Sequence, residues 1–188
     1  MSTASVAGQG LLTAEEFAAR PDPGYPEELV QGRIVRMPVP GARHGHVCNR
    51  VGRFLGAFAD DHDLGYVLNN DAGVITERGP DSVRGPDVSF YSYAKLPKGS
   101  LPEGYPGVPP DAVFEVLSPH DRWPKVLVKV AEYLNAGVGV VCLLDSERQS
   151  LYLYTEDQPG RTFGPDDELV LPDPLSGFRM PVRRFFDA

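Results

Sequence analysis

The chain has 188 residues, of which 41% are hydrophobic and 23% charged, and its formal net charge is −8. This length and composition fit one globular domain of ordinary size and exclude a largely disordered chain. The net negative charge argues against a protein that coats nucleic acid non-specifically, and no apolar stretch is long enough to cross a membrane.

The N-terminus and the two cysteines bear on where the protein works. Residues 1–10, MSTASVAGQG, lack the basic-then-apolar layout of a signal peptide and read as a loose tail ahead of a single domain at 11–188. Cys48 and Cys142 have no metal-ligand spacing and form no disulfide scaffold. We expect both to be buried small residues in a reducing compartment, which favours a cytoplasmic protein.

The first part of the domain predicts a short helix, a hairpin and a long helix. Residues 13–16 have the pattern of a capping box that starts a helix. Residues 28–37 form two β-rich runs that turn at Gln31-Gly32. From about residue 44 to 61, apolar residues follow helical spacing and form one stripe that we expect to be buried.

The middle of the chain is rich in strands. Three candidates lie at 65–68, 72–77 and 87–91, and a fourth at 112–117 has a carboxylate inside an apolar run. The segment from Tyr93 to Asp111 holds five prolines, so we expect a stiff, irregular loop there.

The last part predicts a helix followed by further strands. The helix runs to about Ala136 and ends at Gly137. Residues 138–144 are continuously apolar, which is typical of a central strand covered on both faces, and residues 149–155 alternate as a strand does. The fold class is therefore α/β (α+β), a mixed β-sheet flanked by helices.

Two carboxylates on candidate strands are the most informative feature for function. Asp87 opens one β-rich run, and Glu115 lies inside another. Burying a glutamate in an apolar strand is costly unless it is paired or binds a cation. If the strands are neighbours, both carboxylates can bind one oxygen-preferring divalent ion, with the backbone carbonyl of Val116 as a further ligand. In the alternative, Asp87 caps a turn and Glu115 pairs with an arginine.

Lys129 and Glu28 are candidates for the same site. Lys129 lies on the helix after the Glu115 strand, and its ammonium group could reach back to activate a water or stabilise charge on phosphorus. The alternative is an ordinary solvent-facing lysine. Glu28 opens the first hairpin and is either an outer metal ligand or an exposed edge residue.

Basic residues gather in one stretch of this acidic chain. No acidic residue occurs between Gly32 and Asp60, where several arginines and two histidines lie. This pattern predicts a basic face, or alternatively a solvated surface without a ligand. The residues that we expect to contact nucleic acid are Arg43, His44, Arg50 and Arg84.

Several short motifs follow one another along the chain. They are Glu28-Leu-Val-Gln-Gly32, Arg43-His44-Gly45, Arg84-Gly-Pro-Asp87-Val-Ser-Phe90, Glu115-Val-Leu-Ser-Pro119, Lys129-Val-Ala-Glu-Tyr133 and Gly137-Val138, with Gly177, Phe178 and Pro181 near the end. Their order resembles the bacterial Uma family, over about residues 12–186.

The resemblance implies a restriction-endonuclease-like core of the PD-(D/E)XK type. Asp87 would be the motif aspartate, Glu115 the motif glutamate, and Glu28 the additional acidic residue before the core. The motif lysine would fall at residue 117, which is Leu117, and in Uma-like sequences a lysine on the following helix, here Lys129, stands in for it. A second departure lies after Gly137-Val138, where relatives tend to have Glu-Tyr-Trp and this chain has Gly-Val-Val.

The function that this resemblance implies is a metal-dependent endonuclease. It would use Mg²⁺ or Mn²⁺ to hydrolyse phosphodiester bonds of nucleic acid, with DNA as the expected substrate, and related nucleases commonly pair as homodimers. Two alternatives remain open. The protein could be a catalytically inactive nucleic-acid-binding or assembly module, or a hydrolase of a small phosphate ester whose site is narrowed by the loop between Tyr93 and Asp111.

Overall fold

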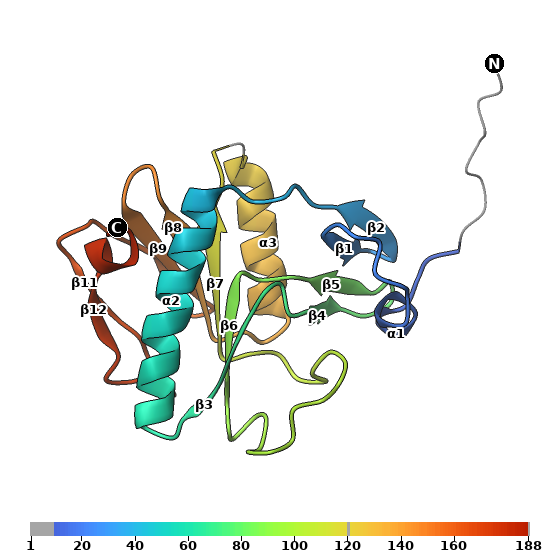
Figure 1. The fold of residues 1–188 in the computed structure, drawn as a ribbon, viewed down its shortest axis with the longest axis horizontal. Helices are drawn as coiled ribbons and strands as arrows, with labels where there is room; N and C mark the ends of the chain where they lie inside the picture. Colours follow the sequence, from blue (N-terminus) through green and yellow to red (C-terminus); the bar gives the residue numbers. More distant parts are fainter. Residues whose placement is uncertain (1–9, 120, 188) are drawn as a thin grey trace.

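A six-stranded mixed sheet forms the centre of the structure and has a long helix on each face (Figure 1). The computed structural model describes residues 10–119 and 121–187. The strand order in this sheet is β10-β9-β8-β7-β6-β3. The strands are β3 (Gly65–Asn69), β6 (Val88–Ser92), β7 (Ala112–Leu117), β8 (Val140–Asp145), β9 (Ser150–Thr155) and β10 (Gln158–Phe163).

Helices α2 (Ala42–Asp61) and α3 (Trp123–Asn135) cover the two faces of this sheet because strand side chains alternate between the faces. Phe114 and Cys142 pack with the buried stripe of α2. Their neighbours Val113 and Val141 pack with Val130 and its surroundings on α3. Both faces of β7 and β8 are therefore covered, which explains the continuous apolar run at 138–144.

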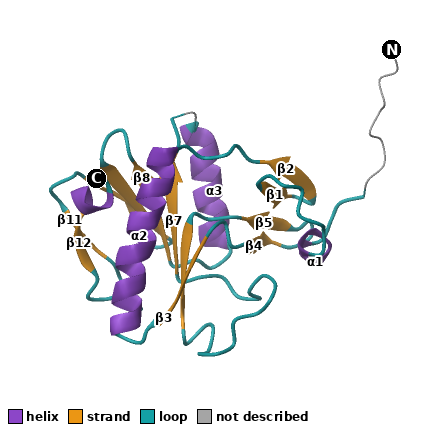
Figure 2. Ribbon diagram, viewed as in Figure 1, coloured by secondary structure: helices purple, strands orange, loops and turns teal. Residues whose placement is uncertain are grey.

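A second, smaller sheet extends from the first and is drawn with it in Figure 2. It has four antiparallel strands in the order β2-β1-β5-β4. Its members are β1 (Glu27–Val30), β2 (Arg33–Arg36), β4 (Val74–Glu77) and β5 (Ser82–Arg84). Helix α1 (Ala14–Ala18) lies beside it, and its N-terminus has the predicted capping box of Thr13 and Glu16. This sheet places β1 and the end of β5 next to α3.

The C-terminal segment packs back on α2. Strands β11 (Glu168–Val170) and β12 (Arg179–Pro181) pair with each other, and the 3₁₀ helix η1 (Val182–Phe185) follows. Val182 and Phe185 are buried in the same core as the α2 stripe. The last described turn of the chain therefore lies against the long helix (Figure 1).

The predicted architecture is confirmed, with differences at short elements. The mixed sheet flanked by helices, the hairpin and both long helices are present. Strand β5 was not predicted, because a strand of three residues gives too little pattern to recognise. The predicted tail at 1–10 lies, apart from Gly10, outside the described residues. Within the described residues, no helix combines the length and apolarity needed to span a membrane.

Candidate active site

Asp87 and Glu115 are brought together by the pairing of β6 with β7. Val88 lies opposite Phe114 in this antiparallel pair, so the residue before Val88 meets the residue after Phe114. The Oδ2 atom of Asp87 accepts a hydrogen bond of 2.7 Å from the backbone N–H of Val116. The two side chains are 13% and 14% exposed. The predicted metal site required the two strands to be neighbours, and β6 and β7 are neighbours in the sheet.

Lys129 lies between two carboxylates. Its Nζ atom is 2.9 Å from Oε1 of Glu115 and 3.1 Å from Oε1 of Glu28. Burial by itself disfavours the ammonium form, but the charges of Glu115 and Glu28 outweigh it and raise the pKa of Lys129 above its usual value. Lys129 is therefore a positive charge fixed beside Glu115, and not a solvent-facing lysine.

The protonation of Glu115 is set by its surroundings. Burial raises the pKa of Glu115 to about 7, against the opposing effect of Lys129. The hydroxyl of Tyr133 donates a hydrogen bond of 2.7 Å to Oε1 of Glu115. A carboxyl group with a pKa raised in this way is typical of functional sites, where burial and charged partners adjust ionisation.

Glu28 is buried in a network that continues to Glu132. Its Oε2 accepts from Nη1 of Arg84 at 2.8 Å, and its Oε1 accepts from the backbone N–H of Gly85 at 3.2 Å. The same arginine donates to both carboxylate oxygens of Glu132, at 2.6 and 2.8 Å. Burial opposes ionisation of Glu28, but Lys129 and Arg84 together hold its pKa below the usual range. Glu28 is thus an ionised carboxylate held by two cations.

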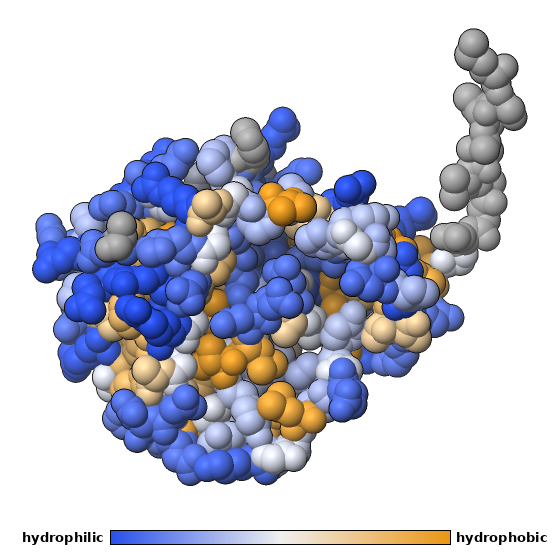
Figure 3. Space-filling view, viewed as in Figure 1, coloured by the Kyte–Doolittle hydropathy of each residue, from blue (hydrophilic) through white to orange (hydrophobic). Residues whose placement is uncertain are grey.

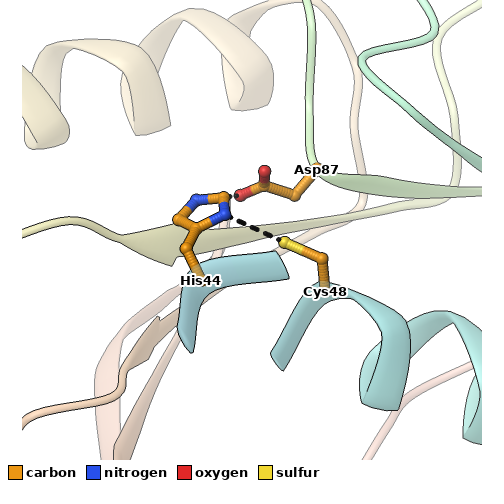
Figure 4. A group of neighbouring side chains, drawn as sticks. All are labelled: His44, Cys48 and Asp87. Carbon is orange, nitrogen blue, oxygen red and sulfur yellow. Dashed lines mark hydrogen bonds and ion pairs between the residues drawn. The ribbon is translucent and has the colours of Figure 1, made fainter. Parts of the chain in front are cut away.

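His44 and Cys48, both on α2, lie beside Asp87 (Figure 4). The Nε2 atom of His44 is 3.4 Å from Oδ2 of Asp87, and its Nδ1 is 3.3 Å from Sγ of Cys48. The hydrogen bond with Asp87 raises the pKa of His44, and burial raises the pKa of the Cys48 thiol. One donor atom from each of the three residues lies within 4.8 Å of the other two, so His44 belongs to the surroundings of Asp87.

The residues predicted to contact nucleic acid have different positions in the structure. Arg43 is exposed and donates to the backbone carbonyl of Ser146, and Arg50 donates to the carbonyl of Arg184. Arg84 is only 12% exposed, and two carboxylates take up its guanidinium group. In the structure this side chain holds Glu28 and Glu132, and a contact of Arg84 with nucleic acid stays a prediction.

Three residues of the site were not predicted from the sequence: Glu132, Tyr133 and Cys48. Glu132 is three residues after Lys129, which is the spacing that puts two side chains on one helix face. Tyr133 is buried in the core, and its hydroxyl reaches Glu115. For Cys48, the sequence signal was its position four residues after His44 on a predicted helix, which places the two side chains on one face.

The donors around Asp87 and Glu115 fit a hard divalent cation. Two carboxylates and a main-chain carbonyl are the ligands that Mg²⁺ and Mn²⁺ prefer. Since the N–H and C=O of one strand residue point to the same side, the carbonyl of Val116 faces the side on which its N–H meets Asp87. Asp87, Glu115 and the Val116 carbonyl are therefore the residues that suit such an ion.

This fold and this arrangement of acidic side chains define a restriction-endonuclease-like protein. Among solved structures, the chain is similar to the crystal structure of "a putative nuclease belonging to DUF820" from Anabaena variabilis ATCC 29413. The TM-score is 0.80 at 20% sequence identity, over 93% of this chain and 97% of that chain. A likeness at this identity shows the fold.

The family follows from the sequence itself. The family Uma2, described as "Putative restriction endonuclease", matches residues 14–183, and the chain belongs to this family. The resemblance seen in the motifs is thereby confirmed. No curated protein matches the chain. The description of this family points to a nuclease.

Proposed function

We propose that this protein is an endonuclease that hydrolyses phosphodiester bonds of DNA with the help of Mg²⁺ or Mn²⁺. The observation that carries the proposal is a pair of contacts around β7. Asp87, just before β6, accepts from the backbone N–H of Val116, and Lys129 on α3 lies 2.9 Å from Glu115. Two carboxylates that suit a cation, with a fixed ammonium group beside them, form an arrangement that can promote phosphodiester hydrolysis.

Asp87, Glu115 and the carbonyl of Val116 would hold the ion. When bound, a divalent ion at this place supplies Lewis-acid polarisation of a phosphoryl oxygen and a more acidic water. Hydrogen bonds within the protein position the two carboxylates. The backbone N–H of Val116 fixes the Asp87 carboxylate, and the Tyr133 hydroxyl fixes Glu115.

Lys129 and Glu28 act as a pair in this proposal. The Lys129 ammonium orients the attacking water or stabilises the negative charge that develops on the phosphoryl group. Glu28 is already engaged with Lys129 and Arg84, which favours a role in holding Lys129 over direct metal binding. Lys129 thereby supplies the positive charge that Leu117 lacks at the motif position.

The second candidate is a catalytically inactive module on the same fold, which binds nucleic acid or assists assembly. Leu117 at the motif position is the observation that favours it. The 2.9 Å contact between Lys129 and Glu115 argues against it. The hydrolase of a small phosphate ester has less support, because the loop between Tyr93 and Asp111 joins the ends of β6 and β7 remote from Asp87. A homodimer stays a prediction.

The test compares wild-type protein with the variants Asp87→Asn and Glu115→Gln. Wild-type protein should nick supercoiled plasmid when Mg²⁺ or Mn²⁺ is added and stop when EDTA is added, and each variant should lose this activity while keeping a folded circular-dichroism spectrum. Titration calorimetry with Mn²⁺ should show binding to the wild type only.

Glu103→Gln is the matched control, since it removes an exposed carboxylate from the loop between Tyr93 and Asp111. It should cleave and bind Mn²⁺ as the wild type does. Normal cleavage by Asp87→Asn or Glu115→Gln would refute the assignment. A wild type that binds duplex but neither Mn²⁺ nor Mg²⁺ would favour the inactive module.

A further inference from the structure

Three arginines surround one aromatic ring on the outer side of α2. The guanidinium carbons of Arg50, Arg53 and Arg184 lie 4.7, 5.0 and 5.4 Å from the centre of the Phe54 ring. Arg50 and Arg53 belong to α2, whereas Arg184 comes from η1 at the end of the chain. Folding therefore concentrates three positive charges at one place.

None of these three guanidinium groups forms an ion pair with a carboxylate among the described residues. The adjacent Arg183 differs, because it pairs with Asp166 at 2.6 Å. The lack of partners is notable in a protein of net charge −8, in which acidic residues outnumber basic ones. The aromatic ring compensates only part of the repulsion, since an exposed cation–π contact is worth about 0.5–1 kcal/mol.

The cluster is also fixed in position. Arg50 donates through Nε and Nη2 to the backbone carbonyl of Arg184, at 2.9 and 2.6 Å. This fork joins α2 to η1, and Phe54 stacks edge-on against the buried Phe185. Arg53 and Arg184 remain exposed, with their donors directed to no acceptor within the described part of the chain. Figure 3 shows strongly hydrophilic side chains gathered over this side of the molecule.

Arginine groups that are stacked, held in place and without a carboxylate are suited to phosphate oxygens, which they bind through a planar fork of donors. The cluster lies on the same helix as His44 of the candidate active site. At 1.5 Å per residue, Arg50 and Arg53 are about 9–14 Å further along the axis of α2 than His44. This offset falls within one turn of duplex, about 34 Å.

We propose that Arg50, Arg53 and Arg184, arranged around Phe54, form a phosphate-binding surface for the backbone of a nucleic-acid duplex. The inference rests on the proposed function for its choice of nucleic acid as the ligand. It extends the predicted role of Arg50 to Arg53 and Arg184, which were not among the residues predicted to contact nucleic acid. The surface contacts backbone and reads no bases, so it contributes affinity without sequence preference.

The test measures binding of a short fluorescent DNA duplex by anisotropy in EDTA, so that no cleavage takes place. The double variant Arg53→Ala/Arg184→Ala removes two exposed guanidinium groups and should bind about tenfold or more weakly. The slope of log K against log salt should become shallower by about 2, because each lost phosphate contact removes about 0.9. Unchanged thermal unfolding would show that the fold is intact.

Arg36→Ala/Arg161→Ala is the matched control. Each of these arginines lies over a single ring, Tyr25 or Phe163, at 4.1 and 4.8 Å, so the control removes the same charge from elsewhere. We expect it to bind duplex within about twofold of the wild type and with an unchanged salt slope. Equal weakening in both double variants would overturn the proposal, and so would stronger binding of wild type to anionic lipid vesicles than to duplex.

The outcomes also separate this inference from the proposed function. If duplex binding depends on Arg53 and Arg184 but no metal-dependent cleavage occurs, the proposed phosphate-binding surface is supported and the proposed nuclease function is refuted. If the wild type cleaves with metal and the double variant binds duplex as the wild type does, the proposed nuclease function is supported and the proposed phosphate-binding surface is refuted.

Discussion

The ammonium group of Lys129 lies 2.9 Å from Oε1 of Glu115, across the gap between α3 and β7. The same ammonium is 3.1 Å from Glu28, which belongs to the smaller sheet. One side chain therefore connects the central sheet, its covering helix and the second sheet. The contact gives the candidate site a positive charge that is held in place before any ligand binds.

Replacement of Lys129 by methionine should abolish cleavage and weaken the fold. The substitution leaves Glu28 and Glu115 without their shared cation, and breaking a buried ion pair costs about 3–5 kcal/mol. Plasmid cleavage should fall at least about 100-fold, the size expected when one stabilising group is removed. Lys129→Arg is the comparison that retains the charge. Wild-type cleavage by a folded Lys129→Met protein would contradict the proposed role.

Replacement of Glu132 by alanine should impair the site from a distance. Glu132 contacts Arg84 through two hydrogen bonds, and Arg84 in turn holds Glu28. The free energy of unfolding in urea should fall by about 1–3 kcal/mol, because a buried guanidinium loses its partner. Cleavage should slow while the midpoint of Mn²⁺ binding changes less, since Glu132 does not touch Asp87 or Glu115 directly. An unchanged cleavage rate would show that Arg84 needs no support from α3.

Replacement of Asp81 by asparagine tests a carboxylate outside the site. The backbone N–H of Ala14 donates to Asp81 Oδ2 at 2.8 Å, and this bond, with those from Gly79 and Arg78, lowers the pKa of Asp81. Because the pKa of Asp81 is lower in the folded than in the unfolded protein, its ionised form stabilises the fold at pH values above the unfolded pKa of about 3.9. This stabilisation is lost as the pH falls through the pKa of the folded state. The variant should lose about 1–2 kcal/mol near neutral pH.

The same variant should differ less from wild type at acid pH. Urea titrations near neutral pH and below about pH 3 measure the two differences. Glu103→Gln, on an exposed loop, is the control and should show no such convergence. A constant difference between wild type and Asp81→Asn at all pH values would contradict the assignment to ionisation.

Replacement of Gly65 by alanine should destabilise the edge of the central sheet. A Cβ atom there would lie 2.0 Å from the backbone oxygen of Tyr91 on β6, which no side-chain adjustment relieves. We expect a loss of about 1–3 kcal/mol or more in the free energy of unfolding. Gly56→Ala in α2 is the matched control, because a Cβ there meets nothing within 4 Å. It should stabilise by about 0.5–1 kcal/mol, and a similar loss in both variants would refute the explanation.

Local patterns in the sequence determined the larger elements. The apolar stripe of α2 predicts a helix because one buried face imposes the helical period, and the continuous apolar run of β8 predicts a strand that is covered on both faces. The sequence also predicted Asp87 at the start of one strand and Glu115 within another; in the structure Glu115 lies on β7, and β6 begins one residue after Asp87. Strand β5 was not predicted because three residues are too few to show an alternating pattern. This strand ends in Arg84.

The composition of the site was only partly open to prediction. Asp87 and Glu115 were recognisable as carboxylates in apolar surroundings, where an ion needs compensation. The sequence did not predict that Arg84 pairs with Glu28 and Glu132, because an arginine in a segment that resembles a loop is equally typical of the surface. The gathering of Arg184 with Arg50 and Arg53 was likewise hidden, since it depends on the chain end returning to α2.

The sequence by itself determined which residues carry charge, which segments become helix or strand, and which carboxylates would be costly to bury. The tertiary structure decided which charges meet, because ion pairs form across distances in the chain that no local pattern records. Lys129 contacts Glu28 only when α3 and the smaller sheet have both packed against β7. The ionisation of the site follows from that packing, since burial and neighbouring charges together set each pKa.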